Sequence, residues 1–199
     1  MNLLTQNAKL KKTSTKNNMR VMNFSLPAYK TITGKTVCPF AKDCIKYCYA
    51  QKGNYKYPSV IKGLNNRYEL SKTADFIPKK NATIILERPT HVRIHDSGDF
   101  YSPEYLQKWV DIATQNKDVI FYAYTKSIKF FINGLKLPKN LKIIFSEGSK
   151  TDNLINTAKD RHARIFKSKE LLEAAGYVNA SDNDLKAITD NKKVGLVYH

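Results

Sequence analysis

The sequence lacks cysteine over most of its length. Its three cysteines, Cys38, Cys44 and Cys48, all fall within residues 38–48, and no other position holds one. An odd number of cysteines cannot be fully paired as disulfides, and clustered thiols are typical of metal-binding or catalytic use. Three thiolates on one loop leave one corner of a metal centre without a protein thiolate, where a substrate or cofactor can bind.

Long hydrophobic runs are missing as well. No stretch reaches the about 18 apolar residues of a membrane span, and the first residues lack the apolar core of a secretory signal. The chain has neither a P-loop nor the glycine fingerprint of a dinucleotide-binding turn. With 42% hydrophobic and 11% aromatic residues, we expect a globular cytoplasmic protein with no membrane partner.

Acidic residues are absent from the first part of the chain. Eight basic residues precede the first carboxylate, Asp43, and the net charge is +17. Such an excess attracts polyanions, and we expect nucleic acid to bind a basic surface; a solvated basic arm explains the same pattern. Because lysines greatly outnumber arginines, contacts to phosphates are favoured over reading of bases.

The organisation of the chain follows from periodicity and charge. Residues 1–20 are polar and basic without a regular pattern, which predicts a flexible or wrapping N-terminal arm. Residues 21–199 then alternate between strands and helices, which predicts one α/β domain. We expect a partial (β/α)6 barrel of mainly parallel strands at 21–25, 92–95, 119–124, 141–145, 163–166 and 194–198. Helices are expected at 58–72, from 103, at 127–132, 152–159 and 168–176, and from 182.

The cysteine loop has the spacing C-x5-C-x3-C and admits three interpretations. The first is an iron–sulfur cluster, since such clusters are bound by thiolates that are often closely spaced. The second is a zinc site of three cysteines and one histidine, which would be His91, His95 or His162. The third is three ordinary buried thiols.

Polar residues follow two of the expected strands, where sites lie in parallel α/β folds. After the strand at 92–95, a turn holds two carboxylates that can accept hydrogen bonds from an amine or ribose, and a glycine that permits close approach of a ligand. After the strand at 141–145, a serine and an acid are similarly placed. Helix capping and surface loops explain both groups equally well. The candidate residues are His95, Asp96, Ser97, Gly98, Asp99, Ser146 and Glu147.

Tyrosines and lysines alternate directly after the cysteines. Tyr47, Tyr49, Tyr55 and Tyr57 lie among lysines, a composition that can stack bases and hold a phosphate backbone. Ordinary packing of tyrosine explains the same composition.

A three-cysteine loop after the first strand of an α/β chain resembles the radical S-adenosylmethionine (SAM) enzymes, whose usual spacing is C-x3-C-x2-C. Tyr47 stands just before Cys48, where these enzymes have an aromatic residue, but the spacing here is a variant. More closely, Leu3-Leu4-Thr5-Gln6-Asn7, Cys38-Pro39-Phe40-Ala41 with Cys48-Tyr49-Ala50, and the turn from His95 to Phe100 resemble a phage-encoded protein family designated by a gene-product number and described as radical-SAM-like.

The resemblance implies a set of roles. Cys38, Cys44 and Cys48 would hold a [4Fe–4S] cluster, and SAM would chelate its open iron and be cleaved to a radical on reduction by an external electron donor. Tyr47 would contact the adenine, and the turn at 95–99 would lie near the SAM amine, although it lacks the usual Gly-Gly-Glu sequence. The host-cell cytoplasm would then be the location.

The expected function is therefore a small [4Fe–4S] protein of the radical SAM type that acts on a nucleic acid or nucleotide. Two alternatives remain open. One is a non-enzymatic iron–sulfur protein that binds nucleic acid, and the other is a zinc-binding protein that uses the same cysteines.

Overall fold

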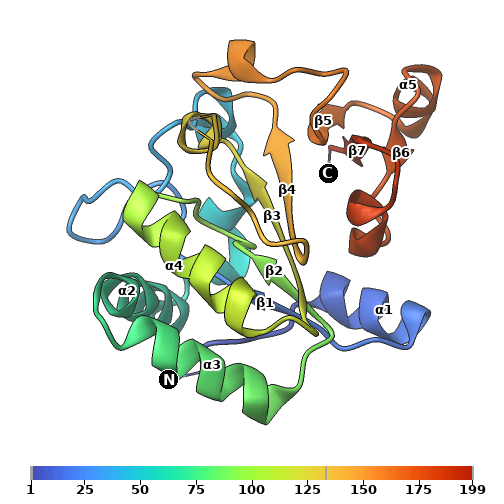
Figure 1. Ribbon diagram of the computed structural model, residues 1–199. Coiled ribbons are helices and arrows are strands. Elements are labelled where there is room, and N and C mark those ends of the chain that lie inside the picture. The colour runs from blue at the N-terminus through green and yellow to red at the C-terminus, as the bar shows by residue number, and fades with distance from the viewer. Residues whose placement is uncertain (1, 133, 199) are drawn as a thin grey trace.

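The computed structural model describes residues 2–132 and 134–198 (Figure 1). In these ranges the strands are β1 Val21–Phe24, β2 His91–Ile94, β3 Ile120–Thr125, β4 Leu141–Ser146, β5 His162–Phe166, β6 Val178–Asn179 and β7 Lys193–Val197. The α-helices are α1 Ala8–Asn17, α2 Pro58–Lys72, α3 Phe76–Glu87, α4 Pro103–Gln115 and α5 Lys169–Ala174. Short 3-10 helices are η1 Asp43–Lys46, η2 Tyr49–Gln51, η3 Gly53–Lys56, η4 Ile128–Phe130, η5 Asp152–Leu154 and η6 Asp184–Ile188.

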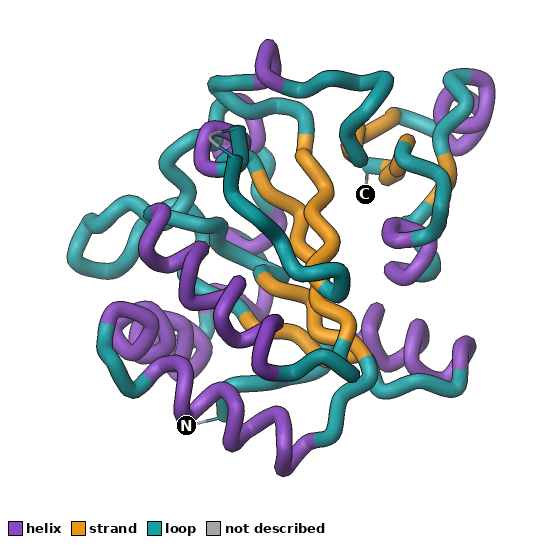
Figure 2. The backbone as a smooth tube through the Cα atoms, viewed as in Figure 1, coloured by secondary structure: helices purple, strands orange, loops and turns teal. Residues whose placement is uncertain are grey.

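The seven described strands form one parallel sheet that curls into a half-barrel. Their order is β1-β2-β3-β4-β5-β7-β6. Strands β4 and β5 share only two register pairs, Phe145 with His162 and Ser146 with Ala163, so the sheet splays between them (Figure 2). The predicted α/β class and partial barrel are confirmed. The expected number of six strands is wrong because β6 has only two residues, too few for a sequence pattern.

Helices α2, α3 and α4 cover the outer face of strands β1 to β3 (Figure 1). Alternate residues of these strands point toward the helices, including Phe24, Ile94 and Phe121. Helix α4 begins at Ser102, whose side chain accepts a hydrogen bond from the Tyr105 backbone N–H, and it buries Trp109 completely. This layer is the main hydrophobic core and fixes the positions of the strand ends.

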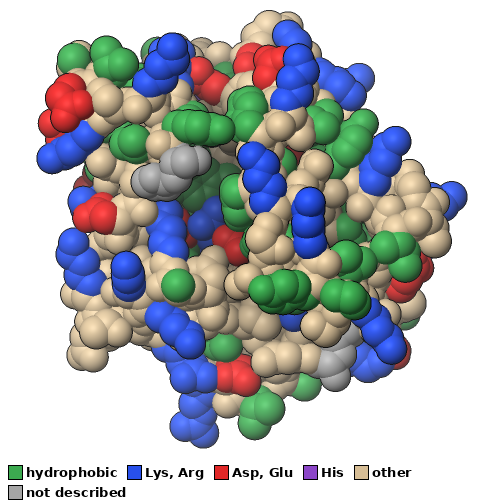
Figure 3. Space-filling view, turned by 180° about the vertical axis from the view of Figure 1, so that it is seen from behind, with side chains coloured by type: hydrophobic (Ala, Val, Ile, Leu, Met, Phe, Trp, Pro, Cys, Tyr) green, Lys and Arg blue, Asp and Glu red, His purple; other side chains and the backbone are tan. Residues whose placement is uncertain are grey.

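The inner face of the half-barrel is packed by both ends of the chain. A second buried cluster joins Leu10 of α1, Tyr122 of β3, Ile144 of β4 and Val194 of β7. Several inward positions are polar instead, such as Arg93 and Asn23, both on neighbouring strands. Viewed from behind, the surface is hollowed, and basic and acidic side chains lie within the hollow (Figure 3).

Residues 2–20 wrap around the domain. Leu3, Leu4 and Leu10 are buried, and Thr5 forms an antiparallel bridge with Asn23 at the edge of β1. Asn7 begins helix α1 by accepting a hydrogen bond from the Leu10 backbone N–H. The described part of this segment thus packs against the sheet through its leucines and the bridge to β1.

Three local predictions differ from the structure. The helix expected at 152–159 is only the short turn η5, because the Asn156 side chain and backbone hold the following residues in turns. The helix expected from 182 is the 3-10 helix η6, which begins at the Asn183 cap. The helix expected at 127–132 is the short 3-10 helix η4. No helix in the described residues is long and apolar enough to span a bilayer.

Candidate functional site

The cysteine loop lies at the carboxyl edge of the sheet, in the segment between β1 and α2. The Cys38 backbone N–H donates to the Tyr29 carbonyl oxygen at 3.3 Å, while Cys44 lies in η1 and Cys48 directly precedes η2. The loop is fastened to the segment after β4, because Ala41 bridges Ser149. The Lys150 backbone N–H also donates to the Phe40 carbonyl oxygen at 2.9 Å. The ends of β1 and β4 thus hold the loop from both sides.

All three thiols are free and half-buried. Burial raises the pKa of each thiol above its ordinary value, most strongly at Cys38, where the Asp99 carboxylate raises the pKa further. The positive charge of Lys126 partly offsets this increase at Cys44 and Cys48, because it favours the deprotonated thiols. Each thiol influences at least one of the others electrostatically, so the three share one environment at this edge.

The three cysteines supply thiolates, which are ligands of both iron–sulfur clusters and zinc. Within residues 2–132 and 134–198, no three His, Cys, Asp or Glu side chains form a group that could hold a metal ion. The histidines considered for zinc are not grouped with the cysteines. His162, for example, makes hydrogen bonds through both ring nitrogens, to the Tyr177 hydroxyl and the Asp160 carbonyl oxygen.

The turn after β2 separates its residues into different environments. The His95 ring lies in the hydrophobic core beside Phe100, and its Nε2 is 2.8 Å from the Tyr105 hydroxyl oxygen. Burial lowers the pKa of His95 to about 3. The ring therefore does not face the cysteine loop. The positive φ of 67° at His95 turns the chain at the end of β2.

Ser97, Gly98 and Asp99 hold neighbouring loops in place. The Ser97 hydroxyl donates to the Leu26 carbonyl oxygen at 2.7 Å, and a Cβ on Gly98 would lie 2.6 Å from the Leu26 Cβ. Asp99 accepts hydrogen bonds from the Thr125 hydroxyl at 2.6 Å and the Lys126 backbone N–H at 2.9 Å. Burial raises the pKa of Asp99 to about 6, although these hydrogen bonds lower it. Asp99 thus joins the turn after β2 to the end of β3.

Asp96 is the carboxylate of this turn that faces the inner side of the half-barrel. Its Oδ2 accepts a hydrogen bond from the Tyr55 hydroxyl at 2.7 Å, and its carbonyl oxygen accepts one from the Tyr49 hydroxyl. Arg93 lies 3.7 Å away. Asp96 also lines a cavity of about 440 Å³ between β1, the first half of α2 and residues 5–7. The cysteine loop is therefore tied to the turn through two tyrosines.

Ser146 and Glu147 follow β4 on the same edge. Glu147 Oε2 accepts a hydrogen bond from Arg164 Nε at 2.6 Å, whereas its Oε1 is buried and has no partner among the described residues. An unpaired buried carboxylate oxygen is costly unless a ligand or water donates to it. Glu147 therefore offers a free acceptor to a ligand amine or hydroxyl.

Lys126 and Tyr47 bring the cysteine loop and the β4 end together. Lys126 Nζ donates to the Ser146 Oγ at 2.8 Å and to the Glu147 carbonyl oxygen at 2.5 Å. A Cβ on Gly148 would lie 3.6 Å from Lys126 Nζ and 4.0 Å from the Tyr47 hydroxyl oxygen. Tyr47 is 36% exposed and packs edge-on against Tyr198. The Tyr47 hydroxyl thus lies near Gly148, the residue that follows Glu147.

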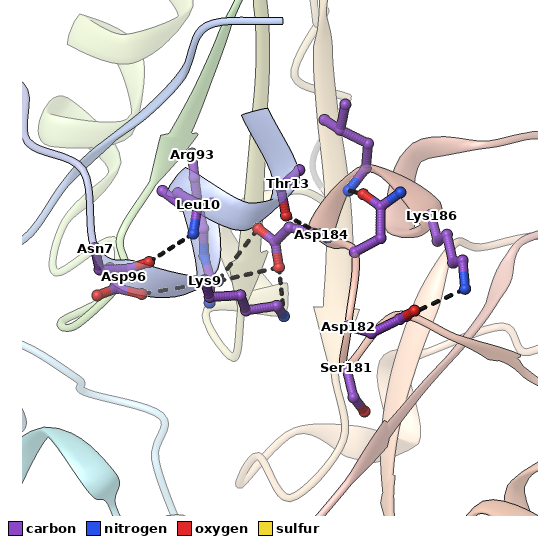
Figure 4. A network of polar contacts seen from close by, with 12 residues as sticks. Asn7, Lys9, Leu10, Thr13, Arg93, Asp96, Ser181, Asp182, Asp184 and Lys186 are labelled. Carbon is purple, nitrogen blue, oxygen red and sulfur yellow. Dashed lines mark hydrogen bonds and ion pairs between the residues drawn. The ribbon is translucent and has the colours of Figure 1, made fainter. Parts of the chain in front are cut away.

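Sequence reasoning missed a buried ion pair inside the half-barrel. Arg93 Nη1 lies 3.2 Å from both carboxylate oxygens of Asp184 (Figure 4). Asp184 also accepts a hydrogen bond from the Tyr122 hydroxyl at 2.6 Å. Lys9 of α1 reaches the same carboxylate at 2.7 Å. Burial opposes ionisation of Asp184, but Arg93 and Lys9 outweigh it and lower its pKa. No local feature of the sequence predicts a contact between residues so far apart in the chain.

Comparison with known proteins defines the family of this half-barrel with its three-cysteine loop. The chain belongs to the gene product 88 family, whose model matches residues 1–199. It is similar to the gene 88 proteins of the mycobacteriophages L5 and D29, with 32% identity over 125 residues to each. These matches cover 55% of this chain and 51% of each relative, so the chain spans about half the length of the curated relatives it matches. No solved structure matches the fold.

Proposed function

We propose that this bacteriophage-family protein binds a [4Fe–4S] cluster through Cys38, Cys44 and Cys48 and is a SAM-dependent radical enzyme. The observation that carries the proposal is that a single loop at the carboxyl edge of a parallel half-barrel holds three free, half-buried thiols. Such a cluster, reduced by an external electron donor, would pass an electron to SAM bound at the open iron, and cleavage would give methionine and a 5′-deoxyadenosyl radical. A nucleic acid or nucleotide is the substrate class that the net charge of +17 favours.

The chain's own residues have separable roles in this proposal. Glu147 Oε1 accepts a hydrogen bond from the amine or a ribose hydroxyl of SAM, because it is buried and has no other donor among the described residues. Tyr47 presents a partly exposed ring near Gly148 and packs against the adenine. Lys126 places a positive charge beside the thiolates, which stabilises their deprotonated form.

The turn at 95–99 supports the site mostly by holding it in shape. Ser97 and Gly98 contact Leu26 in the segment after β1, and Asp99 holds the end of β3. Asp96 is the member of the turn that reaches the cavity, and it accepts from Tyr49 next to Cys48. We assign to Asp96 a hydrogen bond to the polar part of the bound SAM or substrate.

Replacement of single cysteines tests the ligand assignment. In the separate variants Cys38→Ala, Cys44→Ala and Cys48→Ala, we expect iron and sulfide content after anaerobic reconstitution to fall well below that of the unchanged protein. The matched control is Ser149→Ala, which removes a polar side chain from the neighbouring loop without removing a thiolate. Full iron and sulfide content in all three cysteine variants would overturn the assignment.

A non-enzymatic iron–sulfur protein that binds nucleic acid is the second candidate. The basic surface favours it, since such a surface attracts nucleic acid whether or not chemistry follows. In that protein the cluster forms, nucleic acid binds, and SAM leaves the spectrum of the cluster unchanged.

A further inference from the structure

The segment that carries the cysteines has a strong excess of basic over acidic residues. Between Lys30 and Tyr68 the chain holds eight basic residues and one acid, Asp43. Among the ion pairs of residues 2–132 and 134–198, none uses a lysine of this segment. These lysines are also solvent-exposed at Lys35, Lys42, Lys46, Lys52, Lys56 and Lys62. Their charges are therefore free to meet an anionic partner.

Aromatic rings lie among these lysines with their faces open to solvent. Tyr49 is 55% exposed and Tyr57 is 58% exposed, an unusual state for large aromatic side chains. Tyr49 is also held in place, because its hydroxyl donates to the Asp96 carbonyl oxygen and its ring packs edge-on against Tyr55. A ring fixed at its hydroxyl end and exposed elsewhere loses little conformational entropy when a flat ligand stacks on it.

We propose that residues 42–57, called the lysine–tyrosine rim below, bind a single strand of nucleic acid and lead it to the cysteine loop. Stacking on Tyr49 and Tyr57 requires bases whose faces are accessible, which a single strand offers and a duplex does not. Lys46, Lys52 and Lys56 hold phosphates as point charges.

This rim gives no means of reading sequence. Arginine and the amide side chains are the usual readers of base edges, and the exposed cations of residues 42–57 are all lysine. Binding is therefore independent of sequence and strongly dependent on salt. The further statement that the bound strand is the substrate of the cysteine site rests on the proposed function, whereas binding itself does not.

Fluorescence anisotropy of the reconstituted full chain with labelled oligonucleotides tests the proposal. The probes are oligo(dT) and oligo(U) of about 16 nucleotides and a duplex of the same length. We expect both single strands to bind more tightly than the duplex, and the two single-strand arms distinguish DNA from RNA as the preferred ligand. Duplex binding as tight as single-strand binding would overturn the proposal.

Matched charge variants locate the surface. The test variant Lys46→Gln, Lys52→Gln, Lys56→Gln removes three charges from the rim. The control Lys117→Gln, Lys139→Gln, Lys193→Gln removes three exposed charges at the amino-terminal edge, just before β3 and β4 and at the first residue of β7. We expect the test variant to reduce the slope of log affinity against log salt by about 2, since each phosphate contact in a single strand contributes about 0.7. An equal reduction of this slope in both variants would show that the whole basic surface attracts the strand. That result would overturn the proposal that the lysine–tyrosine rim is the binding site.

Tyrosine variants test base stacking separately from the contacts to phosphates. Tyr57→Ala should weaken single-strand binding by at least about fivefold, because a base–aromatic stack contributes about 1 kcal/mol or more, and should leave the salt slope unchanged. Unchanged affinity in Tyr57→Ala and in Tyr49→Ala would contradict stacking. SAM is left out of these measurements, so the rim can fail while the cluster assignment stands, and the cluster assignment can fail while the rim stands.

Discussion

Arg93 and Asp184 form a buried ion pair that joins β2 to η6 across the inside of the half-barrel, with 3.2 Å between Arg93 Nη1 and each carboxylate oxygen (Figure 4). Lys9 and Tyr122 complete the coordination of the carboxylate. The pair thus connects both ends of the chain to the sheet.

Loss of the Asp184 charge should destabilise the fold strongly. In Asp184→Asn, Arg93 keeps its charge without its main partner, and breaking a buried pair in this way costs about 3–5 kcal/mol. The control is Asp182→Asn, an exposed neighbour that pairs with Lys186 and should change the free energy of unfolding by less than about 1 kcal/mol. Urea denaturation measures both, and equal stabilities of the two variants would show that the inner pair is unimportant.

Gly98 should tolerate no side chain, because of its surroundings as well as its backbone. Gly98 and Gly34 have φ values of 84° and 80°, but only Gly98 has atoms near the position of a Cβ. Both Gly→Ala variants bear the backbone strain, and Gly98→Ala adds a collision with Leu26. We expect Gly98→Ala to be less stable than Gly34→Ala by about 1–3 kcal/mol in chemical denaturation. Equal losses of stability in the two variants would show that backbone strain alone causes the destabilisation.

His95 should make stability depend on pH. Its folded pKa of about 3 lies below the ordinary value of 6.5, so the unfolded chain binds the proton more readily. Its contribution is fully present above pH 6.5 and is lost as the pH falls toward 3, with a slope approaching about 1.4 kcal/mol per pH unit. Asp99 has the opposite effect on stability. Because its folded pKa is raised to about 6, its contribution to stability is lost as the pH rises toward 6.

The variant His95→Asn isolates this slope, since asparagine tolerates the positive φ of this position and does not titrate. Denaturation at pH 4, 5 and 7 should show that the stability difference between unchanged protein and variant shrinks as the pH falls. A difference independent of pH would mean that His95 is not held neutral in the core.

Glu147 should contribute to SAM binding through its unpaired oxygen. In Glu147→Gln the side chain keeps its size but loses its charge, and a hydrogen bond to a charged group contributes about 1.5–3 kcal/mol. We expect equilibrium dialysis of the reconstituted protein to give SAM affinity lowered by about tenfold or more. Glu173→Gln, on exposed α5, is the control. Equal affinity of the two variants would remove Glu147 from the site.

Local signals in the sequence predicted most elements of the fold. Pro58 at the first position of α2 and the Ser102 cap of α4 mark helix starts, and both helices begin as expected. Helix α1 gave no such signal, because only Leu10 and Thr13 of its residues are buried. Its docking depends on contacts with Asp184, which lies at the other end of the chain.

The candidate site was predictable in its location and less so in its details. Polar residues after strands do meet at the carboxyl edge, as Asp99, Lys126 and Ser146 show. The direction of each side chain depends on backbone conformation that the sequence does not reveal. His95 therefore faces the core while Asp96, one residue later, faces the inner side of the half-barrel.

The most direct test of the proposed cluster and its open iron is electron paramagnetic resonance of the anaerobically reconstituted and reduced protein, with and without SAM. We expect a reduced [4Fe–4S] signal that shifts when SAM is added, because SAM binds the iron that lacks a protein thiolate. A signal unchanged by SAM would contradict radical SAM chemistry and favour the nucleic-acid-binding protein. Bound zinc with no cluster signal would contradict the iron–sulfur assignment itself.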